Sequence, residues 1–219
     1  MAIVFKNKKY NLEVDSNLLI GVMGSYESFF SSLVGDNVYY INKKYDDSNK
    51  RVCSLLNKDL ENVKKILKEL EIGEAIVDKK INELSHSEQK LLKYVLMVLS
   101  NKKIVIIDEP FMDLDFAGKK KITLLINSLL RKKKTIIVGS VDSNIIYGLC
   151  KKVLFISDNK YYYDDIMAFT NKKVLKEFHI DMPYLVRFVE LAKNKKIRLN
   201  YSRDIRDLMK DVYRNVSQK

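Results

Sequence analysis

The sequence lacks long apolar runs and has few cysteines. No hydrophobic stretch approaches the roughly 18–20 residues that a membrane-spanning helix needs, and the N-terminus has no short apolar block typical of a signal peptide. The two cysteines, Cys53 and Cys150, provide neither a disulfide framework nor a metal-ligand spacing. These absences predict a cytoplasmic protein.

Arginine is also scarce, although the chain is basic. The 219 residues include 40 Lys and Arg against 28 Asp and Glu, which gives a formal charge of +12. Few of the basic residues are Arg, and the lysines are scattered in pairs and triples along the whole chain. Nucleic-acid surfaces concentrate Arg for bidentate and stacking contacts, so a solvated lysine-rich surface is favoured over a nucleic-acid groove. A basic surface is also compatible with an anionic membrane face.

Short segments that are apolar throughout alternate with segments that have helical spacing. The hydrophobic content of 47% is enough for a packed core. A strand is expected to lead into a turn at Gly21. Further strands are expected at 38–41, 52–56, 104–107, 135–138 and 153–156, and helices at 28–33, 60–70, 85–99 and 122–130. This alternation predicts an α/β fold with a mainly parallel sheet that helices flank on both faces.

No strand is expected after about Asp165. Two amphipathic helices follow, around residues 185–192 and 205–212. The expected organisation is an α/β domain at 1–165, a reduced helical subdomain within it at about 60–100, and a small C-terminal helical extension at 166–219.

The most informative segment consists of four β-branched residues, 104–107, followed by Asp108, Glu109 and Pro110. It places two carboxylates at the carboxyl end of a buried strand, where α/β proteins bind ligands. In nucleotide hydrolases an Asp at this place holds Mg²⁺, and the following Glu can polarise the attacking water. A strand followed by an acidic turn without a ligand would have the same composition, so the neighbouring motifs are needed to distinguish the two.

Those motifs lie on both sides of this strand. Upstream, Leu84 and Ser85 precede Glu88, and Ser85 with Glu88 has the spacing of a capping box. A helix that begins there exposes its first amides and can bind an anion. Downstream, residues 111–115 follow the strand, and residues 135–142 form the next strand with its polar end.

This order and spacing resemble the ATP-binding-cassette (ABC) ATPases. In that family the signature motif precedes the Walker B strand at the same separation, 23 positions from Ser85 to Asp108, and the D-loop and switch histidine follow. Residues 114–122 resemble the Leu-Asp-Pro-x-Gly-Arg-x-x-Ile motif of energy-coupling-factor (ECF) transporter ATPases, and the tail resembles their C-terminal extension. The resemblance is clearest from 84 to 156.

The resemblance implies a P-loop NTPase fold with ATP and Mg²⁺ as cofactors. It also implies a second ABC ATPase subunit and an integral-membrane coupling protein as partners, on the inner face of the cell membrane. Glu109 would be catalytic, and Asp108 with Ser28 would hold the metal. The nucleotide-binding positions would be Gly21, Gly24, Ser25, Glu27, Ser28, Ser85, Ser87 and Asp115.

The P-loop position departs from the family pattern. A P-loop reads Gly-x-x-x-x-Gly-Lys-Ser/Thr, whereas residues 21–28 read Gly-Val-Met-Gly-Ser-Tyr-Glu-Ser. Tyr26 replaces the second glycine, where a Cβ is expected to hinder a positive φ and the approach of phosphate. Glu27 replaces the lysine, and a carboxylate about 4 Å from a phosphate would exchange an attraction of roughly 4 kcal/mol for a similar repulsion. No MgATP site is therefore expected in this loop.

Other positions depart in the same direction. Val141 stands at the place of the switch histidine, and His86 and Ser87 replace the two signature glycines. The stretch between the loop and the signature motif is short. Asn57, at the end of the expected 52–56 strand, is the nearest counterpart of the glutamine that links nucleotide to the membrane partner.

Three functions remain open. The first is an ABC subunit of an ECF-type importer that has lost its own ATPase activity. It would pair with a competent ATPase that energises transmembrane transport, and Ser85 would complete the partner's site. The second is an active ABC ATPase with a non-standard P-loop. The third is a non-transport ABC protein that acts on nucleic acid or the ribosome, which only the basic charge supports.

Overall fold

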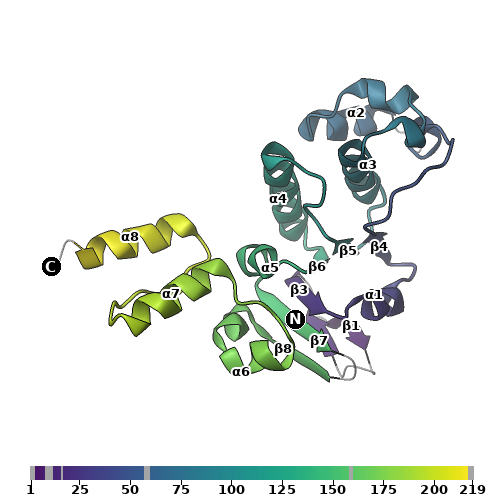
Figure 1. Ribbon diagram of the computed structural model, residues 1–219. Coiled ribbons are helices and arrows are strands. Elements are labelled where there is room, and N and C mark those ends of the chain that lie inside the picture. The colour runs from purple at the N-terminus through teal and green to yellow at the C-terminus, as the bar shows by residue number, and fades with distance from the viewer. Residues whose placement is uncertain (1–2, 8–11, 16, 57–59, 158–159, 217–219) are drawn as a thin grey trace.

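The computed structural model describes residues 3–7, 12–15, 17–56, 60–157 and 160–216. Its centre is a six-stranded sheet in the order β4-β5-β6-β3-β7-β8 (Figure 1). The strands are β3 (Leu19–Gly24), β4 (Val38–Ile41), β5 (Ile104–Asp108), β6 (Thr135–Gly139), β7 (Lys152–Ser157) and β8 (Lys160–Asp165). The first five strands are parallel, and β8 pairs antiparallel with β7. The predicted α/β fold with a mainly parallel sheet is confirmed.

Strand β5 is buried along its whole length because helices cover both faces of the sheet. Val105 and Ile107 belong to the core beneath α3 (His86–Leu99), α4 (Phe116–Arg131) and α5 (Ser143–Leu149). Ile104 and Ile106 point to the other face, which α1 (Glu27–Leu33) covers. Successive residues of a strand alternate between faces, so a sheet covered on both sides selects apolar residues at every position.

A separate antiparallel hairpin of β1 (Ile3–Asn7) and β2 (Leu12–Asp15) precedes the sheet. Between β4 and α3 the chain forms a small arm around α2 (Leu60–Glu69), drawn in blue in Figure 1. The arm also contains three 3₁₀ turns: η1 (Val52–Ser54), η2 (Glu74–Asp78) and η3 (Ile81–Glu83).

The expected strand at 52–56 is wrong. Val52 begins a 3₁₀ turn, and the neighbouring residue Arg51 makes only an isolated bridge to Lys80. The segment is apolar because Val52 and Leu56 are buried in the arm, and none of the described strands pairs with it. Asn57, which was placed at the end of that strand, lies outside the described residues. Conversely, the edge strand β8 was not expected, because its sequence is rich in polar residues.

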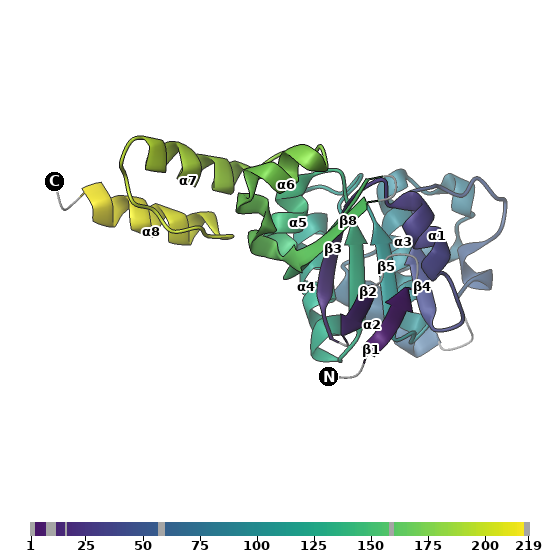
Figure 2. The same ribbon diagram turned by 90° about the horizontal axis from the view of Figure 1, so that it is seen from below.

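After β8 the chain is helical. The turn η4 (Ile166–Thr170) and helix α6 (Lys172–Glu177) pack against the sheet, and α7 (Tyr184–Asn194) and α8 (Ile205–Val216) form a hairpin that projects away from it (Figure 2). Val189, Ala192 and Leu208 form a small core of their own between the two helices.

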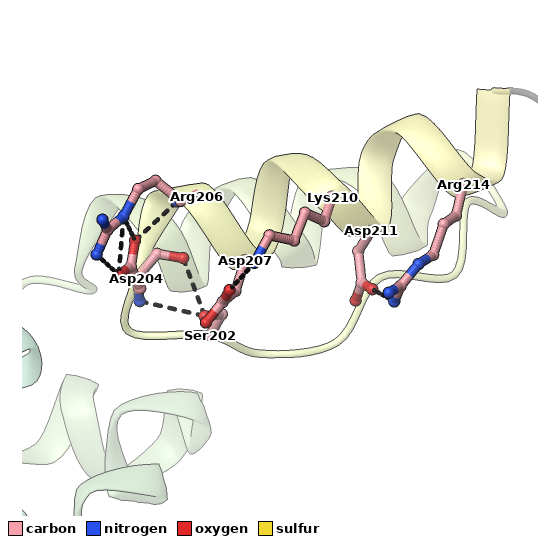
Figure 3. A network of polar contacts seen from close by, with 7 residues as sticks. All are labelled: Ser202, Asp204, Arg206, Asp207, Lys210, Asp211 and Arg214. Atoms are coloured by element: carbon pink, nitrogen blue, oxygen red, sulfur yellow. Dashed lines mark hydrogen bonds and ion pairs between the residues drawn. The ribbon is translucent and has the colours of Figure 1, made fainter.

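Polar contacts organise the start and the outer face of α8 (Figure 3). The Ser202 hydroxyl donates to the Asp204 carbonyl, and the Asp204 amide donates to the Ser202 hydroxyl in return. The Arg206 guanidinium binds the Asp204 carboxylate at 2.6 Å and lowers its pKa to about 2. Ion pairs three residues apart, Lys210 with Asp207 and Arg214 with Asp211, follow along the helix. This face is solvated, so the apolar residues of α8 lie on the opposite face.

Candidate nucleotide site

The segment at the P-loop position is a tight turn from β3 into α1. β3 continues to Gly24, which pairs with Ile156 of β7, so only Ser25 and Tyr26 separate the strand from the helix. The Ser25 amide donates to the Ile156 carbonyl at 3.0 Å, and the Tyr26 amide donates to the Gly24 carbonyl at 2.9 Å. Both amides of the turn are therefore engaged within the protein.

The two retained glycines have packing reasons of their own. Gly24 has a φ of +93°, and a Cβ there would lie 1.9 Å from the Ile156 carbonyl oxygen. A Cβ on Gly21 would lie 2.2 Å from the Ile146 side chain on α5. Each glycine is thus required by the packing of the strand, whether or not a phosphate is near.

Tyr26 fills the space at the ends of β5 and β6. Its side chain is only 4% exposed, and its hydroxyl lies 3.0 Å from Asp108 Oδ1 and 3.3 Å from Glu109 Oε1. The ring packs on Phe30 with centroids 4.8 Å apart, and it lies against Gly139, where a Cβ would come within 2.7 Å of it. Burial, followed by the two carboxylate charges, raises the pKa of Tyr26, so the phenol stays neutral and acts as a donor.

The expected backbone strain at Tyr26 is wrong, because its φ is −87° and it occupies the right-handed helical region. Its obstruction comes from the ring and the hydroxyl, which turn inward. The space is occupied by a side chain whose polar end meets the carboxylates expected to serve the nucleotide.

Glu27 is exposed at the start of α1. Its side chain is 74% exposed and accepts a hydrogen bond from Lys43 Nζ at 2.6 Å, which lowers the pKa of Glu27. The Glu27 charge is therefore paired with an ammonium group of this chain, and its effect on a phosphate stays a prediction. The hydrogen bond to Glu27, followed by the charge of Asp108, raises the pKa of Lys43. The Lys43 ammonium group is thus already paired with a carboxylate.

The two predicted acidic residues do lie together. Asp108 is buried at the end of β5, and Glu109 follows with a φ of 48°. Glu109 Oε2 accepts from the Ser140 hydroxyl at 2.9 Å, and Oε1 accepts from the Val141 amide at 2.8 Å. The carboxylate of Glu109 therefore ties the end of β5 to the end of β6. The Val141 side chain, at the position of the switch histidine, is 80% exposed.

Two residues that sequence reasoning missed hold this end of the sheet. Ser140 binds Glu109, and its position directly after β6 was the available signal. Lys90 on α3 is only 1% exposed, and its Nζ donates to the Asp108 carbonyl at 3.0 Å and the Glu109 carbonyl at 2.7 Å. Burial, followed by the charge of Lys93, lowers the pKa of Lys90 to about 8. Its signal was a charged residue within the apolar helix expected at 85–99.

Asn42 is an amide side chain at the end of a strand. It directly follows β4, the neighbour of β5. Lys93 Nζ donates to its carbonyl and its side-chain oxygen, both at 3.1 Å. Asn42 has the position at a strand end that was expected of Asn57.

At the signature position the predicted capping box is present. The Glu88 amide donates to the Ser85 hydroxyl at 3.2 Å, and the Ser85 amide donates to the Glu88 carboxylate at 2.8 Å. The Ser87 hydroxyl lies 3.2 Å from that of Ser85. The His86 ring stacks on Tyr45 with centroids 4.1 Å apart and an interplanar angle of 4°. Ser85 and His86 are exposed, so this helix start faces outward.

The remaining predicted residues do not join the two carboxylates. Ser25 and Ser28 are exposed. Asp115 accepts a hydrogen bond from the Gly118 amide at 2.7 Å and thereby caps α4. Among the described residues, no group of three or more His, Cys, Asp or Glu is arranged to hold a metal ion. Within the same part of the chain, no helix has the length and apolar character needed to cross a bilayer.

Comparison with curated proteins finds ABC transporter ATP-binding proteins, while no family model matches. An ABC transporter ATP-binding protein of Pyrococcus furiosus is 30% identical over 137 residues, which are 62% of this chain and 51% of that protein. The zinc import ATP-binding protein ZnuC of Ehrlichia chaffeensis is 25% identical, over 80% of this chain and 69% of that protein. The chain thus spans about half the length of the Pyrococcus relative.

Solved structures of ABC proteins share the fold. A metal-chelate type ABC transporter in an inward-facing conformation superposes with a TM-score of 0.65 at 14% identity, over 77% of this chain and 80% of that chain. The cbiO1 protein of Clostridium perfringens, part of the ABC transporter complex cbiONQ, gives a TM-score of 0.60 at 18% identity, over 82% and 90%. The chain is therefore a homologue of ABC transporter ATP-binding proteins, and it has the fold of their ATPase cassette.

Proposed function

We propose that this chain is an ATP-binding-cassette subunit of an ECF-type importer that has lost its own nucleotide site. In this role it is a structural or regulatory partner of a competent ABC ATPase, and the pair energises transport through an integral-membrane coupling protein. The chain would lie on the inner face of the membrane. The observation that carries the proposal is the Tyr26 hydroxyl on the Asp108 and Glu109 carboxylates.

The residues of the turn do not fit MgATP. A phosphate cradle needs free backbone amides, an ammonium group and an accessible carboxylate for the metal. Here the Ser25 amide is bonded to the Ile156 carbonyl and the Tyr26 amide to the Gly24 carbonyl. Lys43 is paired with Glu27, and Asp108 faces the phenol. The amides, the ammonium group and the carboxylate that a phosphate cradle needs are thus all engaged in contacts within the chain.

The start of α3 supports a role toward a partner. Ser85 caps the helix, and its exposed position leaves the helix N-terminus facing outward, where the macrodipole favours negative charge. In an ABC dimer, the phosphate groups of the nucleotide bound to the P-loop of one subunit contact this helix of the other subunit. An intact P-loop on a second, different subunit would therefore give this chain one composite site. Glu109, held by Ser140 and Val141, would contribute to the shape of the sheet end instead of to hydrolysis.

The relatives support transport as the process. They include zinc import ATP-binding proteins, and the structural neighbours include a metal-chelate type transporter and part of the cbiONQ complex. These names favour an importer for small nutrients or metals. The tail hairpin of α7 and α8 agrees with the C-terminal extension on which the ECF assignment rests.

A second candidate function is an active ATPase in which Tyr26 swings out. Lys43 favours it, because its ammonium lies 2.6 Å from the carboxylate of Glu27, the residue at the P-loop lysine position. In this alternative Lys43 would replace the missing P-loop lysine. Hydrolysis that depends on Lys43 would distinguish it from the first proposal.

The direct test is MgATP binding by calorimetry. The native chain is expected to show none at this turn, whereas Tyr26→Gly combined with Glu27→Lys removes the phenol, supplies an ammonium and should bind. The matched control is Glu27→Lys alone, which should still fail because Tyr26 remains on Asp108. Binding by the control that depends on Mg²⁺ would show that Tyr26 is not the obstruction. Circular dichroism verifies that both variants fold.

The two proposed partners are tested by isolating the tagged full chain from its native membranes. A second ABC ATPase that carries the P-loop lysine and a multi-spanning membrane protein are expected to accompany it. Recovery of the chain only as a pair of identical copies would overturn the heterodimer.

A further inference from the structure

Five lysines converge at the end of the sheet opposite Asp108. The turn from α3 into β5 and the turn from α4 into β6 lie side by side, because β5 and β6 are adjacent and parallel. Together they line a cavity of about 470 Å³. Its lining consists of Asn101, Lys102, Lys103, Lys132, Lys133, Lys134 and Thr135. The cavity lined by these five lysines is called the lysine pocket below.

The charges of the lysine pocket have no carboxylate partners among the described residues. Lys134 is only 9% exposed, and its Nζ donates to the Lys102 carbonyl at 2.7 Å. Lys102 Nζ in turn donates to the Asp36 carbonyl at 2.5 Å. Both contacts satisfy a donor but leave the charge uncompensated. Burial, followed by the charge of Lys132, lowers the pKa of Lys134.

Stabilisation of the helix ends does not account for this arrangement. A cation near the last turn of a helix offsets the macrodipole, and one solvated lysine at each end would suffice. Here lysines of two turns line one cavity, and Lys134 is buried. Asn101 and Lys133, with φ of 50° and 60°, fix the path of the two turns. The pocket is therefore a defined feature of the backbone and differs from the scattered lysines of the surface.

We propose that the lysine pocket binds a small soluble anion that carries two or more phosphate groups. Lysine ammonium groups bind phosphate as point charges, and the volume lies within the range of small-molecule sites, roughly 300–1,000 Å³. Several phosphates are needed to meet five ammonium groups spread over two turns. The lining contains no aromatic residue and no Arg, which single-stranded nucleic acid would use for stacking.

The site is separate from the candidate nucleotide site. The whole of β5 lies between the pocket, before Ile104, and the carboxylates at Asp108 and Glu109. An anion in the pocket would therefore not meet Tyr26 or Glu109. The proposal does not depend on the fate of the P-loop, and its failure would leave the proposed transport function intact.

The test is calorimetric titration of the full chain with inorganic tripolyphosphate at low and high salt. Lys132→Gln with Lys133→Gln is expected to weaken binding by about tenfold or more, and high salt should weaken binding by the native chain. The matched control is Lys65→Gln with Lys68→Gln, two exposed lysines of α2 that remove the same charge. Absence of binding by the native chain, or an equal loss in the control, would overturn the proposal.

Further arms distinguish other sources of phosphate. Vesicles of phosphatidylcholine with phosphatidylglycerol and a single-stranded RNA are titrated in the same way. If either binds through the pocket lysines while tripolyphosphate does not, the proposal of a soluble anion is wrong. ATP without Mg²⁺ should compete with tripolyphosphate in the native chain. That competition should persist in Glu27→Lys and disappear in Lys132→Gln with Lys133→Gln, which separates this pocket from any binding at the turn after β3.

Discussion

The two regions that resemble an ABC nucleotide site have opposite states in this chain. At the end of β3 the turn is closed by its own side chain, because Tyr26 is buried and bonded to both acidic residues. At the start of α3 the capping box is intact and Ser85 faces outward. The closed region resembles the interior of a protein, whereas the other resembles a surface prepared for a partner. In the proposed dimer the two halves would serve different nucleotides, so one half can be lost while the other is kept.

The largest expected effect is on the closed region. Tyr26→Ala should lower the free energy of unfolding by about 3–5 kcal/mol, because it removes a buried aromatic ring and leaves Asp108 and Glu109 without its hydroxyl. Urea unfolding of the purified chain measures it. Tyr213→Ala, at a residue that is exposed on α8, is the control and should change stability by at most about 0.5 kcal/mol. A loss for Tyr26→Ala as small as the control's would mean that the turn is open.

The next effect concerns Lys90, which joins α3 to the end of β5. Its pKa in the folded protein is about 8, below its ordinary value of 10.5, so between these pH values the unfolded chain binds more protons. Stability should therefore rise with pH through this window by roughly 1–3 kcal/mol from this group. Unfolding followed from pH 8 to 10 should show the rise in the native chain and a flatter profile in Lys90→Met. Parallel profiles would show that Lys90 is hydrated in both states.

The smallest expected effect is on the outward-facing region. Ser85→Ala should cost about 1 kcal/mol of stability, since it removes only the helix cap. Its effect on the assembled transporter should be larger, because the same position would meet the partner's nucleotide. ATPase assays of the complex, compared with the stability of the isolated chain, separate the two. If the ATPase rate of the complex is unchanged in Ser85→Ala, the composite site proposed between Ser85 and the partner's nucleotide is wrong.

Much of the architecture could be predicted from the sequence. The apolar runs of β3, β5, β6 and β7 are buried on both faces, and the periodicity of α2, α3 and α4 follows their buried sides. The 52–56 segment was predicted wrongly because a short apolar run suits a buried turn as well as a strand. Only the presence of a neighbouring strand distinguishes the two. Strand β8 was missed because an edge strand keeps polar residues on its solvated side.

The candidate site could be predicted in part. The pairing of Asp108 with Glu109 and the Ser85 cap depend on short sequence distances, and both are present. The obstruction was assigned to the Tyr26 Cβ and to the Glu27 charge, whereas the buried ring and hydroxyl of Tyr26 fill the space. A substitution at a loop position indicates that a motif has changed, but the direction of each side chain depends on the surrounding packing. Lys90 could not be foreseen as a donor to strand-end carbonyls, because helix periodicity indicates burial without its partners.

The layers of the fold and the family resemblance follow from periodicity and motif spacing, because both are local properties of the chain. The tertiary structure alone decided which side chain closes the turn after β3, since the Tyr26 hydroxyl and Asp108 are 82 positions apart. It also decided that lysines from two turns meet in one pocket, because only the pairing of β5 with β6 brings those turns together.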